Sequence, residues 1–215
     1  MTEGLRLSIL GDSISTYRGI SDNGDINSHL IYNPYYYTSP LLPENTYWGL
    51  LIGRLGFTLC VNNSYSGGNL SGRDNPDSGV NRAHNLSQND GTSPDVIIVF
   101  MGINDLGRGV DPDVFAEDYA LTLQIIKSTY PNAGVCCVNL PDRDPVLKKR
   151  AEAFNNAISR AAEAAGGSVF IADLFGSRLN NDFYYMNTRD GLHPDEDGMR
   201  IIADIIEDAI RRFMA

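Results

Sequence analysis

The sequence predicts an α/β fold built on a parallel sheet with helices packed on both of its faces. Short apolar runs typical of buried strands alternate with helical patterns along the whole chain, without an internal repeat or a low-complexity linker. The chain has 215 residues, of which 42% are hydrophobic, and this suits one domain with a substantial core. We therefore expect a single domain over residues 1–215, with right-handed crossovers between its strands.

The amino-terminal half contains three of the expected strands and one helix. Residues 6–10, 58–62 and 95–101 are compact apolar runs bounded by Gly, Pro, Asn or Asp, as buried parallel strands usually are. A helical pattern covers residues 46–55. A long insert of about residues 19–45 separates the first strand from this helix.

The carboxyl-terminal half contains two more strands and three helices. A helix opens at residues 111–112, where an acidic cap is followed by proline at the first helical position. Residues 134–139 and 169–172 read as strands, and a helix over 145–165 separates them, ending at a glycine pair. The last helix covers about residues 195–213. Its expected buried stripe consists of Met199, Ile202, Ala203, Ile206, Ile210 and Phe213. Together the two halves predict a five-stranded parallel sheet.

Composition and charge restrict the classes of partner. The formal net charge is −10, so the surface repels phosphate backbones and nucleic acid is a poor partner. The sequence contains no signal-peptide pattern and no apolar run as long as a membrane span, so we expect a cytoplasmic protein. Cys60, Cys136 and Cys137 lie in strand-like runs without a CxxC or Cys/His cluster, so we expect buried reduced thiols. We expect neither a metal nor a cofactor.

Polar motifs follow the expected strands at the points where each strand ends. Ser13 follows the first strand, Gly67 the second and Asn104 the third. Asp190 and His193 lie between the fifth strand and the last helix. Because sites in parallel α/β sheets form at the carboxyl ends of the strands, we expect these residues to converge at one edge.

The serine and the histidine are a candidate nucleophile and general base. Ser13 ends a Gly-Asp-Ser turn, and a serine hydroxyl becomes nucleophilic when a base accepts its proton. Asp190 precedes His193 by three residues and can orient that imidazole. His29 and His84 lie in polar segments and are expected at the surface. Taken singly, each motif also fits an ordinary polar turn or a helix start.

Two further segments are candidate donors to an oxyanion, which forms during acyl transfer and needs fixed hydrogen-bond donors. Asn104 lies in a Gly-Ile-Asn-Asp segment, and its amide is one candidate donor. The backbone N–H of Gly67, or of its neighbour Gly68, is another, because glycine lets the backbone approach a substrate closely. A strand-terminating turn and a flexible loop are the alternative interpretations.

Together the four segments resemble the SGNH hydrolases, also called GDSL esterases. The motifs occur in the family's order, with Ser13 in GDS, Gly67, Asn104 in GxND and His193 in DxxH. The resemblance implies a flavodoxin-like three-layer α/β/α sandwich and a triad of Ser13, Asp190 and His193. It also implies an oxyanion hole formed by the Ser13 N–H, the Gly67 N–H and the Asn104 amide. The first block reads GDSISTYRG where the family usually has GDSL.

The substrate is less constrained than the chemistry. The family includes lipases, lysophospholipases, thioesterases, carbohydrate deacetylases and acyltransferases. Within this range we expect a short-chain ester, and specifically an acetyl ester on a carbohydrate. Tyr36 in the insert and Tyr185 before the acid are candidate residues for stacking on a sugar ring. Each belongs to an aromatic cluster that fits packing on the domain or a subunit contact equally well. The neighbouring residues in these clusters are Tyr32, Tyr35, Tyr37, Tyr184 and Met186.

Two other classes compete with a serine esterase. A metallophosphoesterase would use Asp12, Asn104, Asp105 and His193 as ligands, although such sites usually draw on several histidines around two ions. A non-catalytic flavodoxin-like binding domain is compatible with the fold, but the first turn has neither Walker spacing nor GxGxxG. The sequence also has no GxSxG elbow of the α/β-hydrolases.

Overall fold

The computed structural model describes residues 4–17, 42–141, 147–176, 188 and 191–215, and it contains a five-stranded parallel sheet. The strands lie in the order β2-β1-β3-β4-β5. Their bounds are Arg6–Gly11 for β1, Thr58–Ser64 for β2, Val96–Phe100 for β3, Gly134–Val138 for β4 and Val169–Ala172 for β5. This is the flavodoxin-like order, so the predicted fold class is confirmed.

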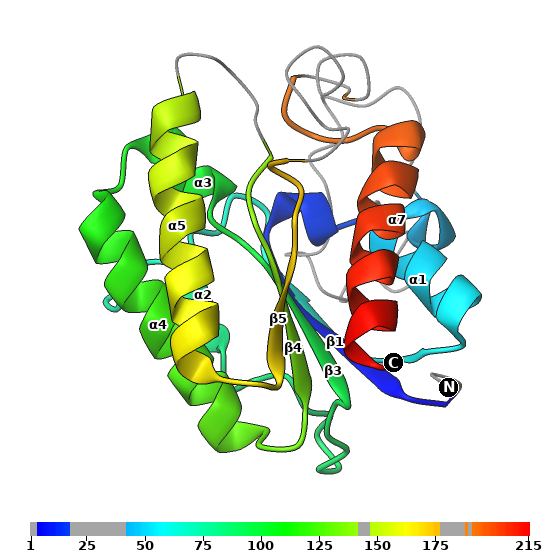
Figure 1. The fold of residues 1–215 in the computed structure, drawn as a ribbon. Helices are drawn as coiled ribbons and strands as arrows, with labels where there is room; N and C mark the ends of the chain where they lie inside the picture. The colour runs from blue at the N-terminus through cyan, green and yellow to red at the C-terminus, as the bar shows by residue number, and fades with distance from the viewer. Residues whose placement is uncertain (1–3, 18–41, 142–146, 177–187, 189–190) are drawn as a thin grey trace, which may run out of the picture.

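Helices cover both faces of the sheet, as Figure 1 shows. Helices α1 (Tyr47–Leu55) and α7 (Glu196–Phe213) lie together on one face. Helices α4 (Pro112–Thr129) and α5 (Lys148–Ala165) cover the other face, together with the short α2 (Gly79–Arg82). The predicted three-layer sandwich is therefore confirmed.

Side-chain caps fix where three of the long helices begin. Thr46 accepts a hydrogen bond from the Gly49 N–H at 3.0 Å, and Asp111 accepts one from the Asp113 N–H at 2.8 Å. Asp195 accepts one from the Gly198 N–H at 2.8 Å. The caps reproduce the predicted starts of these helices, whereas α5 begins at residue 148, three residues later than expected, and residues 142–146 lie outside the described ranges.

The sequence did not predict the shortest helices. These are η1 (Ser13–Ser15), η4 (Pro43–Asn45), α2 and α3 (Ile103–Arg108). A strand-terminating turn was the alternative interpretation of the segment after β3, and this segment turns at Gly102, with φ +125°, directly into α3. Such helices have fewer than two turns, so they carry no readable apolar period.

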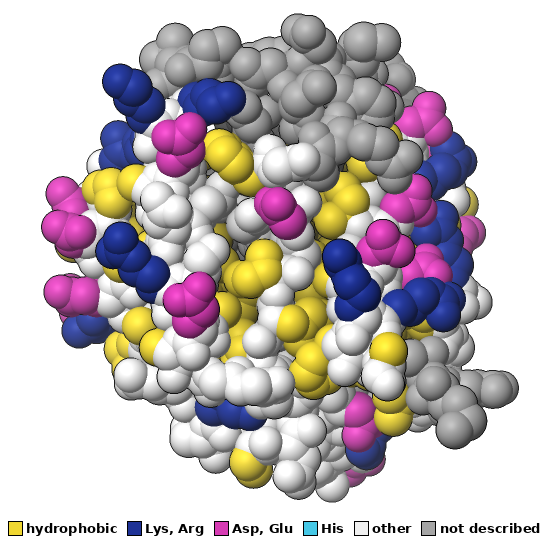
Figure 2. Space-filling view, viewed as in Figure 1, with side chains coloured by type: hydrophobic (Ala, Val, Ile, Leu, Met, Phe, Trp, Pro, Cys, Tyr) yellow, Lys and Arg dark blue, Asp and Glu magenta, His cyan; other side chains and the backbone are white. Residues whose placement is uncertain are grey.

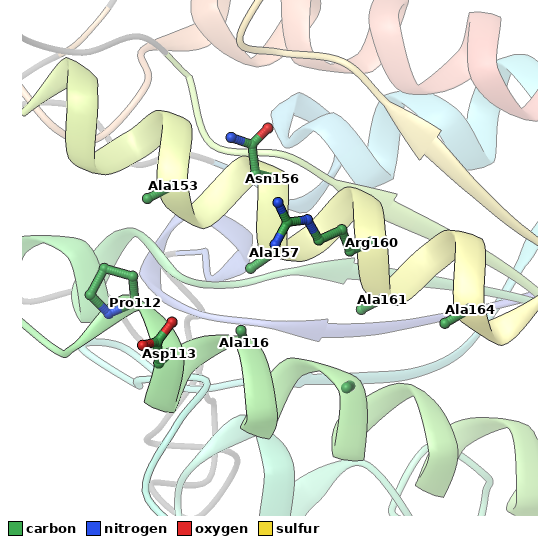
Figure 3. A pocket seen from close by; sticks show the side chains of 10 residues that line it. Pro112, Asp113, Ala116, Ala153, Asn156, Ala157, Arg160, Ala161 and Ala164 are labelled. Atoms are coloured by element: carbon green, nitrogen blue, oxygen red, sulfur yellow. The ribbon is translucent and has the colours of Figure 1, made fainter.

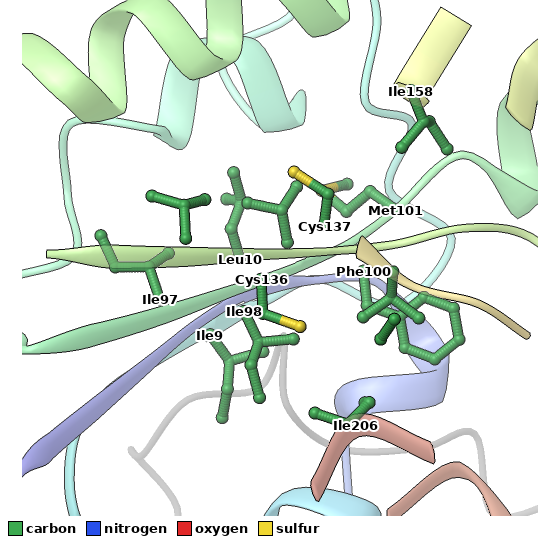
Figure 4. Packing of buried hydrophobic residues seen from close by; sticks show 14 of the residues in the cluster. Ile9, Leu10, Ile97, Ile98, Phe100, Met101, Cys136, Cys137, Ile158 and Ile206 are labelled. Carbon is green, nitrogen blue, oxygen red and sulfur yellow. The ribbon is translucent and has the colours of Figure 1, made fainter. Parts of the chain in front are cut away.

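The core lies on both sides of the central strands. Every residue of β3 and β4 is buried, and their alternating side chains reach both helical layers, as Figure 4 shows. Cys136 and Cys137 project to opposite faces, toward the α7 and α5 layers respectively. All three cysteines are free and buried, as expected. Burial raises the pKa of the Cys137 thiol to about 12, so it stays protonated.

Strand β5 forms one edge of the sheet. Its residue Phe170 is half-buried and stacks on Phe213 of α7, with ring centroids 4.3 Å apart. Figure 2 shows hydrophobic side chains gathered on this side between charged residues. Within the described ranges, no helix has both the length and the apolarity to cross a membrane.

Candidate active site

The predicted site residues leave the sheet from neighbouring strands. Strand β1 pairs with both β2 and β3, so the topology switches direction around it. In doubly wound sheets this switch point forms a crevice at the carboxyl ends of the strands. Ser13 follows β1, and Asn104 follows β3. The order of the strands thus brings the two motifs to one position.

Ser13 and His193 lie within hydrogen-bond distance although 180 residues separate them. Ser13 Oγ is 2.9 Å from His193 Nε2, and Ser13 is 4% exposed. Thr188 and Pro194 form an antiparallel bridge, and the Gly191 N–H donates to Thr188 Oγ1 at 3.1 Å. These contacts bracket His193 and hold it just before α7.

The turn that carries Ser13 is closely packed. Asp12 caps η1 by accepting the Ile14 N–H at 3.0 Å, and Thr16 Oγ1 donates to the Ser13 carbonyl at 2.7 Å. A Cβ added to Gly11 would lie 2.5 Å from the hydroxyl oxygens of Ser15 and Ser64. Gly11 is therefore required for steric reasons, a role that the sequence did not reveal.

Asp12 is a buried carboxyl in this turn, 1% exposed. Burial raises its pKa to about 7, and the nearby Asp105 adds to the rise. The Ile14 N–H, the Arg82 charge and a hydrogen bond from the Asn104 side chain oppose it. Near neutral pH, the protonated and ionised forms of Asp12 therefore coexist, and Asp12 directly precedes the candidate nucleophile in the chain.

The Tyr65–Gly68 segment forms a β-turn that distinguishes between the two candidate glycines. The Gly68 N–H donates to the Tyr65 carbonyl at 2.9 Å, and Gly67 has φ +74°. A positive φ at the third residue is the mark of a type II turn, in which glycine is favoured. Because the Gly68 N–H is used inside the turn, the geometry favours the Gly67 N–H as an oxyanion donor.

The adjacent residues Asn104 and Asp105 have separate roles. Asn104 Nδ2 donates to the Gly68 carbonyl at 3.0 Å, which places the amide beside the turn. Asp105 is fully buried and accepts the N–H groups of Leu70 and Ser71 at 2.7 and 3.0 Å, as well as the Ser71 hydroxyl. Asn104 thus lies beside the turn that contains Gly67. Asp105 instead fixes the loop at Leu70 and Ser71 to α3.

The carboxylates that the alternative of a metal centre would use as ligands already accept hydrogen bonds from the protein. Both oxygens of Asp105 accept protein N–H groups, and one oxygen of Asp12 accepts the Ile14 N–H. Among the residues that the structure describes, no group of three or more His, Cys, Asp or Glu side chains has the arrangement of a metal site. The carboxylates near Ser13 therefore act as hydrogen-bond acceptors within the protein.

Several predicted residues lie outside the described ranges, namely the candidate acid Asp190 and the candidate substrate-binding residues Tyr36 and Tyr185. The same holds for His29 and for the other aromatic-cluster residues: Tyr32, Tyr35, Tyr37, Tyr184 and Met186. His84 is exposed, as expected.

A surface pocket of about 400 Å³ lies between α4 and α5, as Figure 3 shows. Its lining consists largely of alanines from both helices and also includes the charged side chains of Asp113 and Arg160. Its lining contains none of Ser13, Asn104 and His193. It is therefore separate from the candidate active site.

Comparison with known proteins is consistent with this geometry. Residues 9–201 match the model of the GDSL-like lipase/acylhydrolase family. The comparison with curated protein sequences gives no match. A crystal structure named as a GDSL-like lipase from Bacteroides ovatus superimposes with a TM-score of 0.72 at 24% identity, covering 98% of this chain and 99% of that chain.

Two further solved structures share the fold. One is named as a GDSL-like lipase from Bacteroides uniformis, with a TM-score of 0.73 and 23% identity over 97% of this chain and 96% of that chain. The other is a family 3 carbohydrate esterase from Clostridium thermocellum, with a TM-score of 0.67 and 17% identity over 99% of this chain and 98% of that chain. At these identities the likeness shows the common architecture.

Proposed function

The chain belongs to the GDSL-like lipase/acylhydrolase family, and we propose that it is a serine esterase acting on short-chain esters, with an acetylated carbohydrate as its substrate class. The observation that carries this proposal is the 2.9 Å contact between Ser13 Oγ and His193 Nε2. It pairs a nearly buried hydroxyl with a base, and two candidate oxyanion donors leave the same edge of the sheet.

The proposed reaction begins with attack of Ser13 Oγ on the ester carbonyl while His193 Nε2 accepts the hydroxyl proton. The carbonyl oxygen gains a negative charge as the carbon becomes tetrahedral. The Ser13 N–H, the Gly67 N–H and the Asn104 amide are the proposed donors to this oxyanion.

Collapse of the tetrahedral species completes the first half of the reaction. The protonated His193 returns the proton to the leaving alcohol, and the acyl group remains on Ser13. His193 then takes a proton from water, whose oxygen attacks the acyl carbon, and it returns this proton to Ser13 Oγ as the bond between Oγ and the acyl carbon breaks and the acid leaves. Since Nε2 must accept in the resting enzyme, Nδ1 carries the hydrogen, and we assign Asp190 as the acceptor that orients it.

Two experiments test the assignment of the nucleophile. A fluorophosphonate should label Ser13, as identified by mass spectrometry of the modified peptide. Ser13→Ala should abolish both labelling and ester hydrolysis while leaving the melting temperature near that of the wild type. Labelling at another serine, or retained hydrolysis in the variant, would disprove the assignment.

The substrate class rests on fold likeness to a carbohydrate esterase and is tested separately. We expect kcat/KM on p-nitrophenyl esters to be highest for acetate and to fall toward palmitate. We also expect acetate release from acetylated oligosaccharides, measured by an enzyme-coupled assay. A maximum at long acyl chains would instead favour a lipase, in line with the names of the Bacteroides structures.

A further inference from the structure

Two arginine side chains contact the turn that contains Gly67. Arg108 comes from the end of α3 and Arg82 from the end of α2. A Cβ added to Gly67 would lie 3.4 Å from Arg108 Nη2, and one added to Gly68 would lie 3.4 Å from Arg82 Nη2. One guanidinium group therefore lies against each glycine of the pair.

Arg108 fixes the turn to α3. Its Nη1 donates to the Gly67 carbonyl at 2.7 Å and also to the side-chain oxygen of Asn69. Arg108 follows Asn104 by four residues, so both side chains project from the same face of the helix. Asn104 bonds the Gly68 carbonyl, which means that one helix face holds two consecutive carbonyls of the turn.

Arg82 fixes the strand ends beneath the turn. It is 3% exposed, and its Nη2 donates to the Gly11 carbonyl at 3.1 Å, while Nη1 donates to the carbonyl and side chain of Asn63. Gly11 ends β1 just before Asp12 and Ser13, and Asn63 lies near the end of β2.

The Arg82 guanidinium also lies 4.4 Å from the ring centroid of Tyr65, the first residue of the turn. Burial lowers the pKa of Arg82 to about 10, so it remains charged at neutral pH. A buried charge is costly unless its donors are satisfied, and here Nε completes the set by donating to the Asp77 carbonyl at 2.8 Å.

We propose that Arg82 and Arg108 are positioning residues that hold the Gly67 N–H in register with Ser13 and Asn104. This proposal deepens the esterase function and rests on it. A glycine at the third position of a turn permits more than one turn type, and a change of type rotates the peptide that carries its N–H. An oxyanion donor works only when it is fixed about 2.7–3.1 Å from the forming charge. The two guanidinium groups restrict this freedom by docking the turn against α3 and against the ends of β1 and β2.

Arg108 carries the principal test because it is exposed and its replacement should not unfold the protein. We expect Arg108→Gln to lower kcat on p-nitrophenyl acetate by about ten- to a hundredfold, with KM within a factor of about two, because misplacement of a donor acts on the transition state. Arg108→Lys should recover part of this loss, since an ammonium reaches the Gly67 carbonyl without the second bond of the fork. Arg150→Gln is the matched control. Arg150 binds the Val110 carbonyl and has no hydrogen bond to the turn, so kcat should not change.

A second substrate separates positioning from binding of an anionic group. The partners of Arg108 within the described ranges are neutral, so the alternative role to be tested is binding of a substrate carboxylate. We expect the same fall in kcat for p-nitrophenyl acetate and for 4-acetoxybenzoate, whose alcohol portion carries a carboxylate. A rise in KM confined to 4-acetoxybenzoate would overturn the positioning role.

Hydrogen exchange tests, independently of activity, whether Arg82 and Arg108 restrain the turn. The Gly68 amide closes the turn, and its exchange in Arg108→Gln and in Arg82→Lys should be at least about tenfold faster than in the wild type if the arginines restrain the turn. Unchanged exchange in both variants would overturn the proposal even if the enzyme proved to have another activity. Absence of fluorophosphonate labelling in the wild type would instead overturn the esterase assignment. The exchange experiment would still show whether the two arginines restrain the turn.

Discussion

At the scale of single residues, replacement of Asn104 distinguishes a catalytic role from a structural one most directly. Its amide nitrogen has two hydrogens, of which one is donated to the Gly68 carbonyl at 3.0 Å and the other to Asp12, so as an oxyanion donor it would exchange one of these partners for the substrate oxygen. Loss of one oxyanion donor typically costs about 2.7–4 kcal/mol, on the order of a hundred- to a thousandfold in rate. We expect Asn104→Ala to lower kcat by this factor with KM nearly unchanged, in kinetics normalised to fluorophosphonate titration. A folded variant with normal kcat would remove Asn104 from the oxyanion hole.

Asp12 gives a second prediction, which concerns the pH dependence of stability. In the folded protein its pKa is raised to about 7, whereas an unfolded aspartate titrates near its reference pKa of about 3.9. Between these values the unfolded chain loses the proton first, so this group lowers the stability of the folded state as pH rises.

Asp12→Asn should remove that penalty and keep the acceptor for the Ile14 N–H. We expect the melting temperature of the variant, relative to the wild type, to increase from pH 4 to pH 7 and then to level off. Differential scanning fluorimetry in a series of buffers measures this. A difference independent of pH would show that Asp12 is ionised throughout the range.

The sequence predicted the residues that a chemical motif marks and missed those that act through distant contacts. Ser13 and His193 were predicted from short motifs, and the structure places them 2.9 Å apart. Arg82 had no predicted role because its partners Gly11 and Asn63 lie 71 and 19 residues away in the chain. The apolar residues Val80, Ala83 and Leu86 are buried beside it, but three residues are too few to reveal a helical period.

At the scale of elements, the strands could be predicted from the sequence and the shortest helices could not. Buried parallel strands appear as continuous apolar runs, so all five were predicted to within two residues of each observed end. Helix α3 has six residues and is fixed from outside, through Asp105 and the loop at Leu70 and Ser71. Such a helix depends on tertiary bonds, which a local pattern cannot show.

Two helix caps provide the prediction at this scale. Asp111 caps α4 and Asp195 caps α7 in the same manner, each accepting one backbone N–H at 2.8 Å. Replacing either by alanine should lower the free energy of unfolding by about 1 kcal/mol, measured by urea denaturation.

The two cap variants should differ in activity. Asp195 lies two residues after His193, and α7 continues directly from it, so fraying of this helix should displace the base and lower kcat. Asp111→Ala is the matched control, because α4 lies on the face of the sheet opposite α7. Equal kcat in the two variants would show that fraying at the start of α7 does not displace the histidine.

At the scale of the whole molecule, the parallel pattern was predicted from alternation, while the order of the strands was implied only by the family resemblance. That order determines which strands lie at an edge. Cys60 lies on the edge strand β2, 8% exposed, and its thiol is 3.4 Å from the Thr92 carbonyl. Cys136 and Cys137 lie on β4, between β3 and β5, and are fully buried.

The reactivity of the three thiols should therefore distinguish local opening of the edge strand from global unfolding. An edge strand can open locally, but exposure of Cys136 or Cys137 requires separation of β4 from a helical layer, which amounts to loss of the core. We expect 5,5′-dithiobis(2-nitrobenzoate) to label Cys60 first, with a rate that depends weakly on urea. In a Cys60→Ser variant, labelling should proceed only with the urea dependence of global unfolding, because burial also keeps the Cys137 thiol protonated, with a pKa of about 12. Labelling of Cys137 as fast as that of Cys60 would mean that the layer of α4 and α5 detaches without unfolding the sheet.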